Sequence, residues 1–159
     1  MNRPQVTRPK NRAGVSAVLL ACLVLGALFF AGPASAYSRG FRLTNTGDKT
    51  LTLVGASKIP AKLCNGYHCV QSHHPMSFEG RPKDGSTLKP GEVDVWELQS
   101  LPFEIYGAIL KYEVADHLGH HLGIVEYTIK TSTLSNDSSC KVTPGAGKCT
   151  AGGLGLSFN

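Results

Sequence analysis

The chain has 159 residues, with 16 Lys and Arg, 11 Asp and Glu, six His and five Cys. Four of the basic residues and none of the acidic ones precede residue 37, so residues 37–159 carry 12 positive and 11 negative formal charges, a net charge of +1. A nearly neutral domain lacks the clustered Lys and Arg that hold a phosphate backbone, which argues against DNA or RNA as a partner.

Residues 1–36 are predicted to be a secretory signal peptide. They contain a basic stretch, an apolar run over residues 15–30 and a small-residue site that ends at Ala36. This order predicts a signal helix, cleavage after Ala36 and a secreted, extracellular protein that meets a membrane only through this segment before cleavage. Its Arg content and small residues favour a bacterial signal.

Two alternatives to a cleaved signal stay open. The apolar run is close to the roughly 17 residues that span a bilayer, so a retained membrane anchor is one of them. The other is a lipidated Cys22, because residues 19–22 loosely match a lipobox, although the apolar run continues beyond this cysteine.

The part after the signal contains four cysteines, and an even number in an oxidising compartment predicts two disulfides. We expect local pairing, Cys64 with Cys69 and Cys140 with Cys149, because turn-forming residues lie within each pair. Each short closed loop should contribute about 2–3 kcal/mol. A zinc site is the alternative, but the two spacings are a poor match to those of zinc sites.

Apolar residues recur at every second position between turn signals, which predicts strands. An opening hairpin is predicted over residues 41–54. The following segment, residues 57–91, is rich in Pro, Gly, His and Lys and is predicted to be mainly connection, with a short edge strand at 76–78. Trp96 shares a strand face with Asp94, and we predict a half-buried core residue, with an edge position or a place in a site as the alternatives.

The clearest pattern is a long antiparallel hairpin over residues 106–129, with its turn at 116–121. A small hairpin is predicted at 140–149, and residues 154–158 alternate as a last strand. The resulting seven or eight short strands, without helical periodicity outside the signal, predict an all-β fold. Residues 37–159 should form a single two-sheet antiparallel β-sandwich or a jelly-roll-like domain.

The six histidines form two groups and are candidate ligand or metal residues, because neutral imidazole is a common metal ligand. They are His68, His73 and His74 in the connection and His117, His120 and His121 in the turn of the long hairpin. Since ordinary turns have the same composition, we predict no cofactor and no resident metal.

If all six histidines are exposed, a fall in pH through about 6.5 moves the net charge of residues 37–159 from +1 toward +7 and strengthens binding to acidic surfaces.

Catalytic motifs are missing: the sequence has no nucleophile elbow, no His-Glu-x-x-His and no phosphate loop. Strand alternation predicts solvent-facing positions for the carboxylates of Glu97, Glu104, Glu113 and Glu126. We therefore predict a monomeric, non-enzymatic binding protein for an extracellular or cell-surface ligand. Its contacts are expected in three loops, residues 62–84, 117–121 and 140–149.

Two other functions are weighed beside this one. A secreted proteinase inhibitor would use a disulfide-braced loop; the size and bridge count are similar to those of bacterial subtilisin inhibitors, but the cysteine spacing and the reactive-site motif do not match. A membrane-active or metal-binding extracellular protein is the other, with Tyr67, Phe78 and Trp96 as the aromatic residues available to contact lipid.

Overall fold

The computed structural model describes residues 37–65, 67–73 and 76–159. The predicted signal peptide and His74 lie outside the described residues. Within these ranges no helix is long and apolar enough to cross a membrane.

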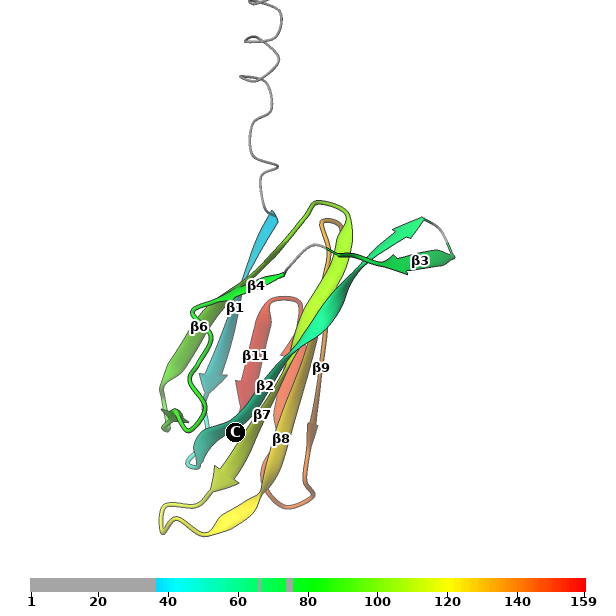
Figure 1. The fold of residues 1–159 in the computed structure, drawn as a ribbon. Coiled ribbons are helices and arrows are strands. Elements are labelled where there is room, and N and C mark those ends of the chain that lie inside the picture. Colours follow the sequence, from blue (N-terminus) through cyan, green and yellow to red (C-terminus); the bar gives the residue numbers. More distant parts are fainter. Residues whose placement is uncertain (1–36, 66, 74–75) are drawn as a thin grey trace, which may run out of the picture. The chain divides into compact units, whose positions relative to one another are not determined.

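Two sheets form the domain (Figure 1). The five strands of the first sheet, in chain order, are β1 (Tyr37–Asn45), β4 (Ser77–Glu79), β6 (Val93–Ser100), β10 (Cys149–Gly152) and β11 (Gly155–Phe158). The second contains β2 (Thr50–Asn65), β3 (His68–Gln71), β5 (Thr87–Leu88), β7 (Glu104–Ala115), β8 (His121–Thr131) and β9 (Asn136–Val142). The spatial orders are β10-β11-β1-β6-β4 and β3-β2-β7-β8-β9, with β5 beside β2. All pairs are antiparallel except β1 with β11.

A single hydrophobic core takes side chains from both sheets, which confirms the predicted all-β, two-sheet fold. Alternation places every second residue of β7, from Tyr106 to Val114, completely inside. Trp96 comes from the opposite sheet, is 1% exposed and stacks on Phe41. The predicted core position of Trp96 is therefore confirmed, with deeper burial than expected.

The predicted opening hairpin is wrong, because its two strands lie in different sheets. β1 pairs with β6 and β11, whereas β2 pairs with β7. The buried side chain of Asn45 explains the corner: its amide donates to the carbonyl oxygens of Lys49 and Leu88, at 2.7 and 3.0 Å. These bonds satisfy backbone acceptors where the chain leaves one sheet for the other, so no hairpin ladder is needed there.

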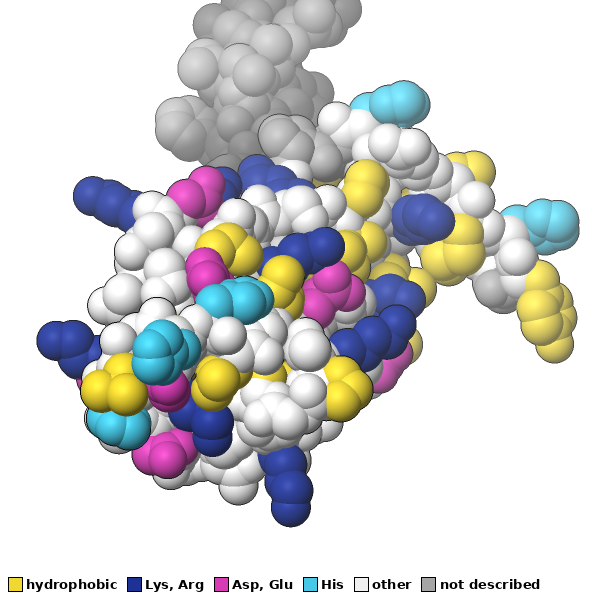
Figure 2. All heavy atoms as spheres, turned by 90° about the horizontal axis from the view of Figure 1, so that it is seen from below, with side chains coloured by type: hydrophobic (Ala, Val, Ile, Leu, Met, Phe, Trp, Pro, Cys, Tyr) yellow, Lys and Arg dark blue, Asp and Glu magenta, His cyan; other side chains and the backbone are white. Residues whose placement is uncertain are grey.

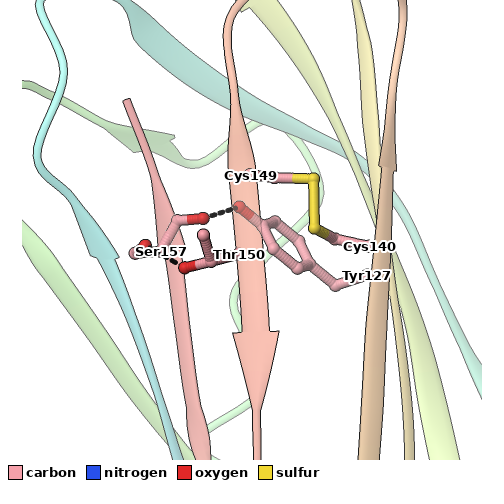
Figure 3. Close-up of a disulfide and its surroundings, with 5 residues drawn as sticks. All are labelled: Tyr127, Cys140, Cys149, Thr150 and Ser157. Atoms are coloured by element: carbon pink, nitrogen blue, oxygen red, sulfur yellow. Dashed lines mark hydrogen bonds between the residues drawn. A yellow bond between two sulfur atoms is a disulfide. The ribbon is translucent and has the colours of Figure 1, made fainter.

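The predicted small hairpin at 140–149 is a second corner between the sheets. β9 is an edge strand of the second sheet and β10 an edge strand of the first, and the disulfide Cys140–Cys149 links them (Figure 3). Beside it, the hydroxyl of Tyr127 in β8 donates to the carbonyl oxygen of Ser157 in β11, at 2.9 Å. The two sheets are thus joined at this edge by a covalent bond and a hydrogen bond.

Two buried tyrosines provide a matched test of this inter-sheet bond. Burial raises the pKa of both Tyr112 and Tyr127, so both hydroxyls stay protonated at neutral pH. The Tyr112 hydroxyl has no hydrogen-bond partner among the described residues. We expect Tyr127→Phe to lower the free energy of unfolding by about 1 kcal/mol and Tyr112→Phe to leave it unchanged or raise it. Urea denaturation of both variants is the measurement, and equal losses would contradict the assignment.

The segment at 57–91, predicted to be mainly connection, contains more strand than expected. β2 continues through Pro60 to Asn65, because its pairing with β7 is interrupted between Ile59 and Lys62 and the missing proline donor falls in this irregularity. β3 and β5 also lie in this segment. The predicted edge strand at 76–78 is confirmed as β4, at the end of the first sheet.

Candidate binding surface

The end of β2 and all of β3 form a hairpin, residues 62–71, which we call the arm. It projects away from the two sheets in Figure 1. Lys62 pairs with Gln71 at its base, and Asn65 with His68 beside its tip. The disulfide Cys64–Cys69 joins directly opposed residues of the two strands. Both predicted disulfide pairings are therefore confirmed, and this one holds the arm closed.

The arm continues the second sheet past the region in which the core is covered. Leu63 lies opposite Glu104 of β7 and opposite Val70 of β3, so both side chains continue the inner, core-facing side of the sheet. They are nevertheless 47% and 65% exposed. The arm therefore presents to solvent an apolar pair of the type that the sandwich buries elsewhere.

Two neighbouring turns add exposed apolar side chains beside the arm. Phe103, between β6 and β7, is 67% exposed, and Leu134, between β8 and β9, is 88% exposed. With Ile105 and Cys64 they line a shallow pocket of about 190 Å³. We call this end of the domain the apolar end. Its exposed apolar side chains lie on the inner side of the arm, on the outer side of β7, and at the tip of the arm and on the two turns; they are Leu63, Val70, Ile105, Tyr67, Phe103 and Leu134.

Phe103 is held in a strained backbone conformation. Its φ of 68° lies in the left-handed region, which costs a bulky residue about 1–3 kcal/mol. Its N–H donates to Oγ1 of Thr133 at 2.7 Å, so the two turns are bonded to each other. An exposed aromatic ring kept in place against such strain is typical of a functional surface, since strain of this kind collects at ligand contacts.

A buried carboxylate fixes the base of the arm. Glu104 is 3% exposed and accepts hydrogen bonds from the hydroxyls of Ser72 and Ser100 and, at 3.2 Å, from the N–H of Leu101. Ser72 directly follows the arm, so this network ties the arm to the start of β7. The prediction that Glu104 faces solvent is wrong: the alternation that buries Tyr106 also turns Glu104 inward, and this signal was available in the sequence.

The arm and the chain on either side of it contain basic residues and no carboxylate. Residues 56–78 contain Lys58, Lys62 and three histidines but no Asp or Glu. In Figure 2 the arm, at the right, shows blue, cyan and yellow side chains and no magenta on the visible side. Glu104 is the nearest carboxylate along β7, and it is buried. The field beside the arm therefore favours an anionic partner, while the exposed Asp137, three residues after Leu134, lies opposite Lys130 in the strand pairing.

The histidines at the opposite end of the hairpin do not converge. Nδ1 of His120 lies 3.0 Å from Oδ2 of Asp116, and Nδ1 of His121 lies 2.6 Å from Oε1 of Glu113, so each ring has its own carboxylate. His117 is exposed in the same turn. Among the described residues no three His, Cys, Asp or Glu side chains are placed to hold a metal ion. His68 and His73 are exposed in and after the arm.

The turn between β7 and β8 has a testable pH dependence. Hydrogen bonds to Asp116, first from the backbone N–H of His120 and then from its ring and from Leu118, hold the pKa of this carboxyl below 3.8. Because the folded-state pKa is lowered, the stabilisation is present above the ordinary value and is lost as the pH falls through the lowered one. We expect an NMR titration of Asp116 to have its midpoint below 3.8. In His120→Ala the backbone bonds persist, so most of the lowering should remain; a midpoint at the ordinary value would contradict this.

The remaining carboxylates form ordinary surface contacts. Glu126 pairs with Lys111 across the hairpin at 3.0 Å, and Glu113 contacts His121, so these two glutamates do not face each other as a hydrolytic couple would. Glu97 is exposed, as predicted.

Of the aromatic residues predicted to contact lipid, only Tyr67 is freely exposed. Phe78 packs against the core and Trp96 lies within it. The sequence interpretation missed Phe103 and Leu134, although each follows a break in the alternation, Pro102 for the first and a Ser/Thr-rich turn for the second. The chain matches no protein-family model, and no curated protein matches it. Its function must therefore be inferred from the surface itself.

Proposed function

We propose that this chain is a secreted, non-enzymatic binding protein that contacts its ligand through the apolar end. The observation that supports the proposal is that exposed Phe103, Ile105 and Leu134 line one pocket with Cys64 of the arm, and that the arm itself exposes further large apolar side chains. Soluble monomers rarely expose large contiguous apolar patches, and patches rimmed by polar residues mark interaction sites.

The way this surface is held also favours binding. The Cys64–Cys69 disulfide closes the arm, Glu104 fixes its base, and Thr133 holds the turn of Phe103. Rigid presentation reduces the conformational entropy that is lost when a ligand binds. The pocket lining contributes only the hydroxyls of Ser132 and Thr133 as side-chain polar groups, without a general acid or base, which favours binding over catalysis.

Secretion is part of the proposal. Two disulfides fit an extracellular protein, and the first 36 residues have the order of a bacterial signal cleaved after Ala36. Mass analysis of protein from the culture supernatant, with and without reductant, should give a chain beginning at Tyr37 and lacking free thiols. An intact precursor with reduced cysteines in the cytosol would contradict it.

A cell-binding assay tests the proposed surface. Fluorescently labelled protein should bind saturably to washed cells of the producing strain, and Tyr67→Ser, Phe103→Ser and Leu134→Ser combined should weaken binding by at least about tenfold, because buried aromatic and apolar anchors dominate binding energies.

The matched control removes three apolar side chains that are exposed elsewhere, in Val95→Ser, Leu118→Ser and Ile124→Ser combined. It should bind like the unmodified protein. Binding that is not saturable, or is lost equally in both variants, would contradict the proposal. Stoichiometric inhibition of a subtilisin-type protease would favour the inhibitor function instead.

A further inference from the structure

The described chain begins at the apolar end. The hydroxyl of Tyr37 donates to the carbonyl oxygen of Thr133 at 3.3 Å, and Nη2 of Arg39 donates to the same oxygen at 3.1 Å. Leu134 is the next residue along the chain. The start of β1 is therefore hydrogen-bonded to the turn between β8 and β9, whose Leu134 is more exposed than Phe103 on the neighbouring turn.

The predicted signal segment therefore joins the domain at the apolar end. Six residues, 31–36, separate its apolar run at 15–30 from Tyr37 in the sequence.

The side chains of the apolar end suit a bilayer surface better than a protein surface. Tyr67 is exposed at the tip of the arm, and Phe103 and Leu134 are exposed on separate turns that line a shallow pocket, so the three side chains project individually. A protein partner would need a separate pocket of matching shape for each of them, whereas lipid chains adapt to protruding rings and aliphatic groups. Tyr is also common at membrane–water interfaces.

The basic residues of the arm favour lipids with anionic headgroups. Lys62 is exposed on the arm, opposite Ile105 in the strand pairing, and residues 56–78 contain no carboxylate that would repel an anionic headgroup. Cations near an anionic bilayer contribute about 1 kcal/mol each, in addition to the burial of apolar side chains.

We propose that the apolar end binds the surface of an anionic phospholipid bilayer, with Tyr67, Phe103 and Leu134 entering the interface and Lys62 contacting headgroups. This inference rests on the proposed function and names the ligand of the same surface.

Cosedimentation with lipid vesicles tests the inference on the purified, disulfide-bonded protein. Vesicles of equal parts phosphatidylcholine and phosphatidylglycerol should bind the protein at least about tenfold better than pure phosphatidylcholine. The triple variant Tyr67→Ser, Phe103→Ser, Leu134→Ser should lose at least about tenfold, because each inserted side chain contributes apolar burial. The control triple variant at Val95, Leu118 and Ile124 should bind normally.

A pair of charge variants separates headgroup contact from general charge. Lys62→Gln should weaken binding to the anionic vesicles by about fivefold, whereas Lys148→Gln, which removes an exposed lysine outside the arm, should have no effect. Unchanged thermal midpoints and intact disulfides establish that each variant is folded.

The outcomes distinguish this inference from the function on which it rests. Saturable binding to cells without binding to either vesicle overturns the lipid inference and leaves the binding function. Loss of cell binding after protease treatment of the cells, again without vesicle binding, overturns it in favour of a protein partner. A concentration-dependent dimer in sedimentation equilibrium that the first triple variant abolishes overturns it in favour of a second copy. Absence of binding to both cells and vesicles overturns both proposals.

Discussion

Gly107→Ala is expected to lower the free energy of unfolding by about 4 kcal/mol or more, a large part of the roughly 5–15 kcal/mol that stabilises a typical domain. Gly107 lies in β7, opposite Lys130 of β8. A Cβ atom at this position would overlap the carbonyl oxygen of Ile129, and it would lie 2.9 Å from the carbonyl carbon of the same residue and 3.2 Å from Cδ1 of Ile59.

The clash is severe because the atoms nearest to the added Cβ belong to the backbone of Ile129. A flexible side chain could rotate away, but relief from Ile129 requires β7 and β8 to separate near the open end of the hairpin, beside the buried side chains of Tyr106 and Ala108. Urea denaturation, or the yield of disulfide-bonded soluble protein, is the measurement. Gly40→Ala in β1 is the control, since no atom outside its chain neighbours lies within 4 Å of the added methyl group. A loss below about 1 kcal/mol for Gly107→Ala would contradict the close approach of the two strands.

Glu104→Ala is expected to lower the free energy of unfolding by about 3 kcal/mol and to loosen the arm. Its removal leaves the buried hydroxyl of Ser100 and the N–H of Leu101 without this acceptor, and it ends the hydrogen bond that Ser72 donates to Glu104. A buried donor left unsatisfied costs about 1–3 kcal/mol. Glu104→Gln keeps one carbonyl acceptor, so its loss should be intermediate.

Two measurements separate the global effect from the local one. Urea denaturation reports the stability of the sandwich, and limited trypsin digestion reports opening of the arm, where Lys62 is an exposed cleavage site. Glu97→Ala, which removes an exposed carboxylate bonded to Ser38, is the control and should change stability by less than about 1 kcal/mol. Equal trypsin rates for Glu104→Ala and the unmodified protein would show that Glu104 does not anchor the arm.

The Glu104 variant also connects stability to function. If the arm must be held in place to present Leu63, Tyr67 and Val70 together, a variant that stays folded but has a loosened arm should bind cells and anionic vesicles more weakly. The effect should be smaller than that of the triple variant, because the apolar side chains themselves are still present.

Much of the architecture follows from local sequence patterns. Period-two alternation predicts the strands and the buried face of β7, because successive side chains of a strand point to opposite sides. Both disulfide pairings follow from the turn residues that each pair encloses, since a short loop with a turn brings its ends together whatever the rest of the chain does. The long hairpin of β7 and β8 follows for the same reason, because its strands are adjacent in sequence.

Tertiary structure alone decided which strands became neighbours and which surfaces stayed uncovered. Residues 41–54 and 140–149 carry hairpin patterns, yet each turns a corner between sheets, because Asn45 satisfies the backbone at one corner and the core has to be closed from two sides. The strand pairing places both Trp96 and Leu63 on inner faces. Trp96 is buried because the second sheet lies opposite, and Leu63 is exposed because the arm extends beyond the first sheet. Exposure depends on what lies across the core from a residue, and that partner is distant in sequence.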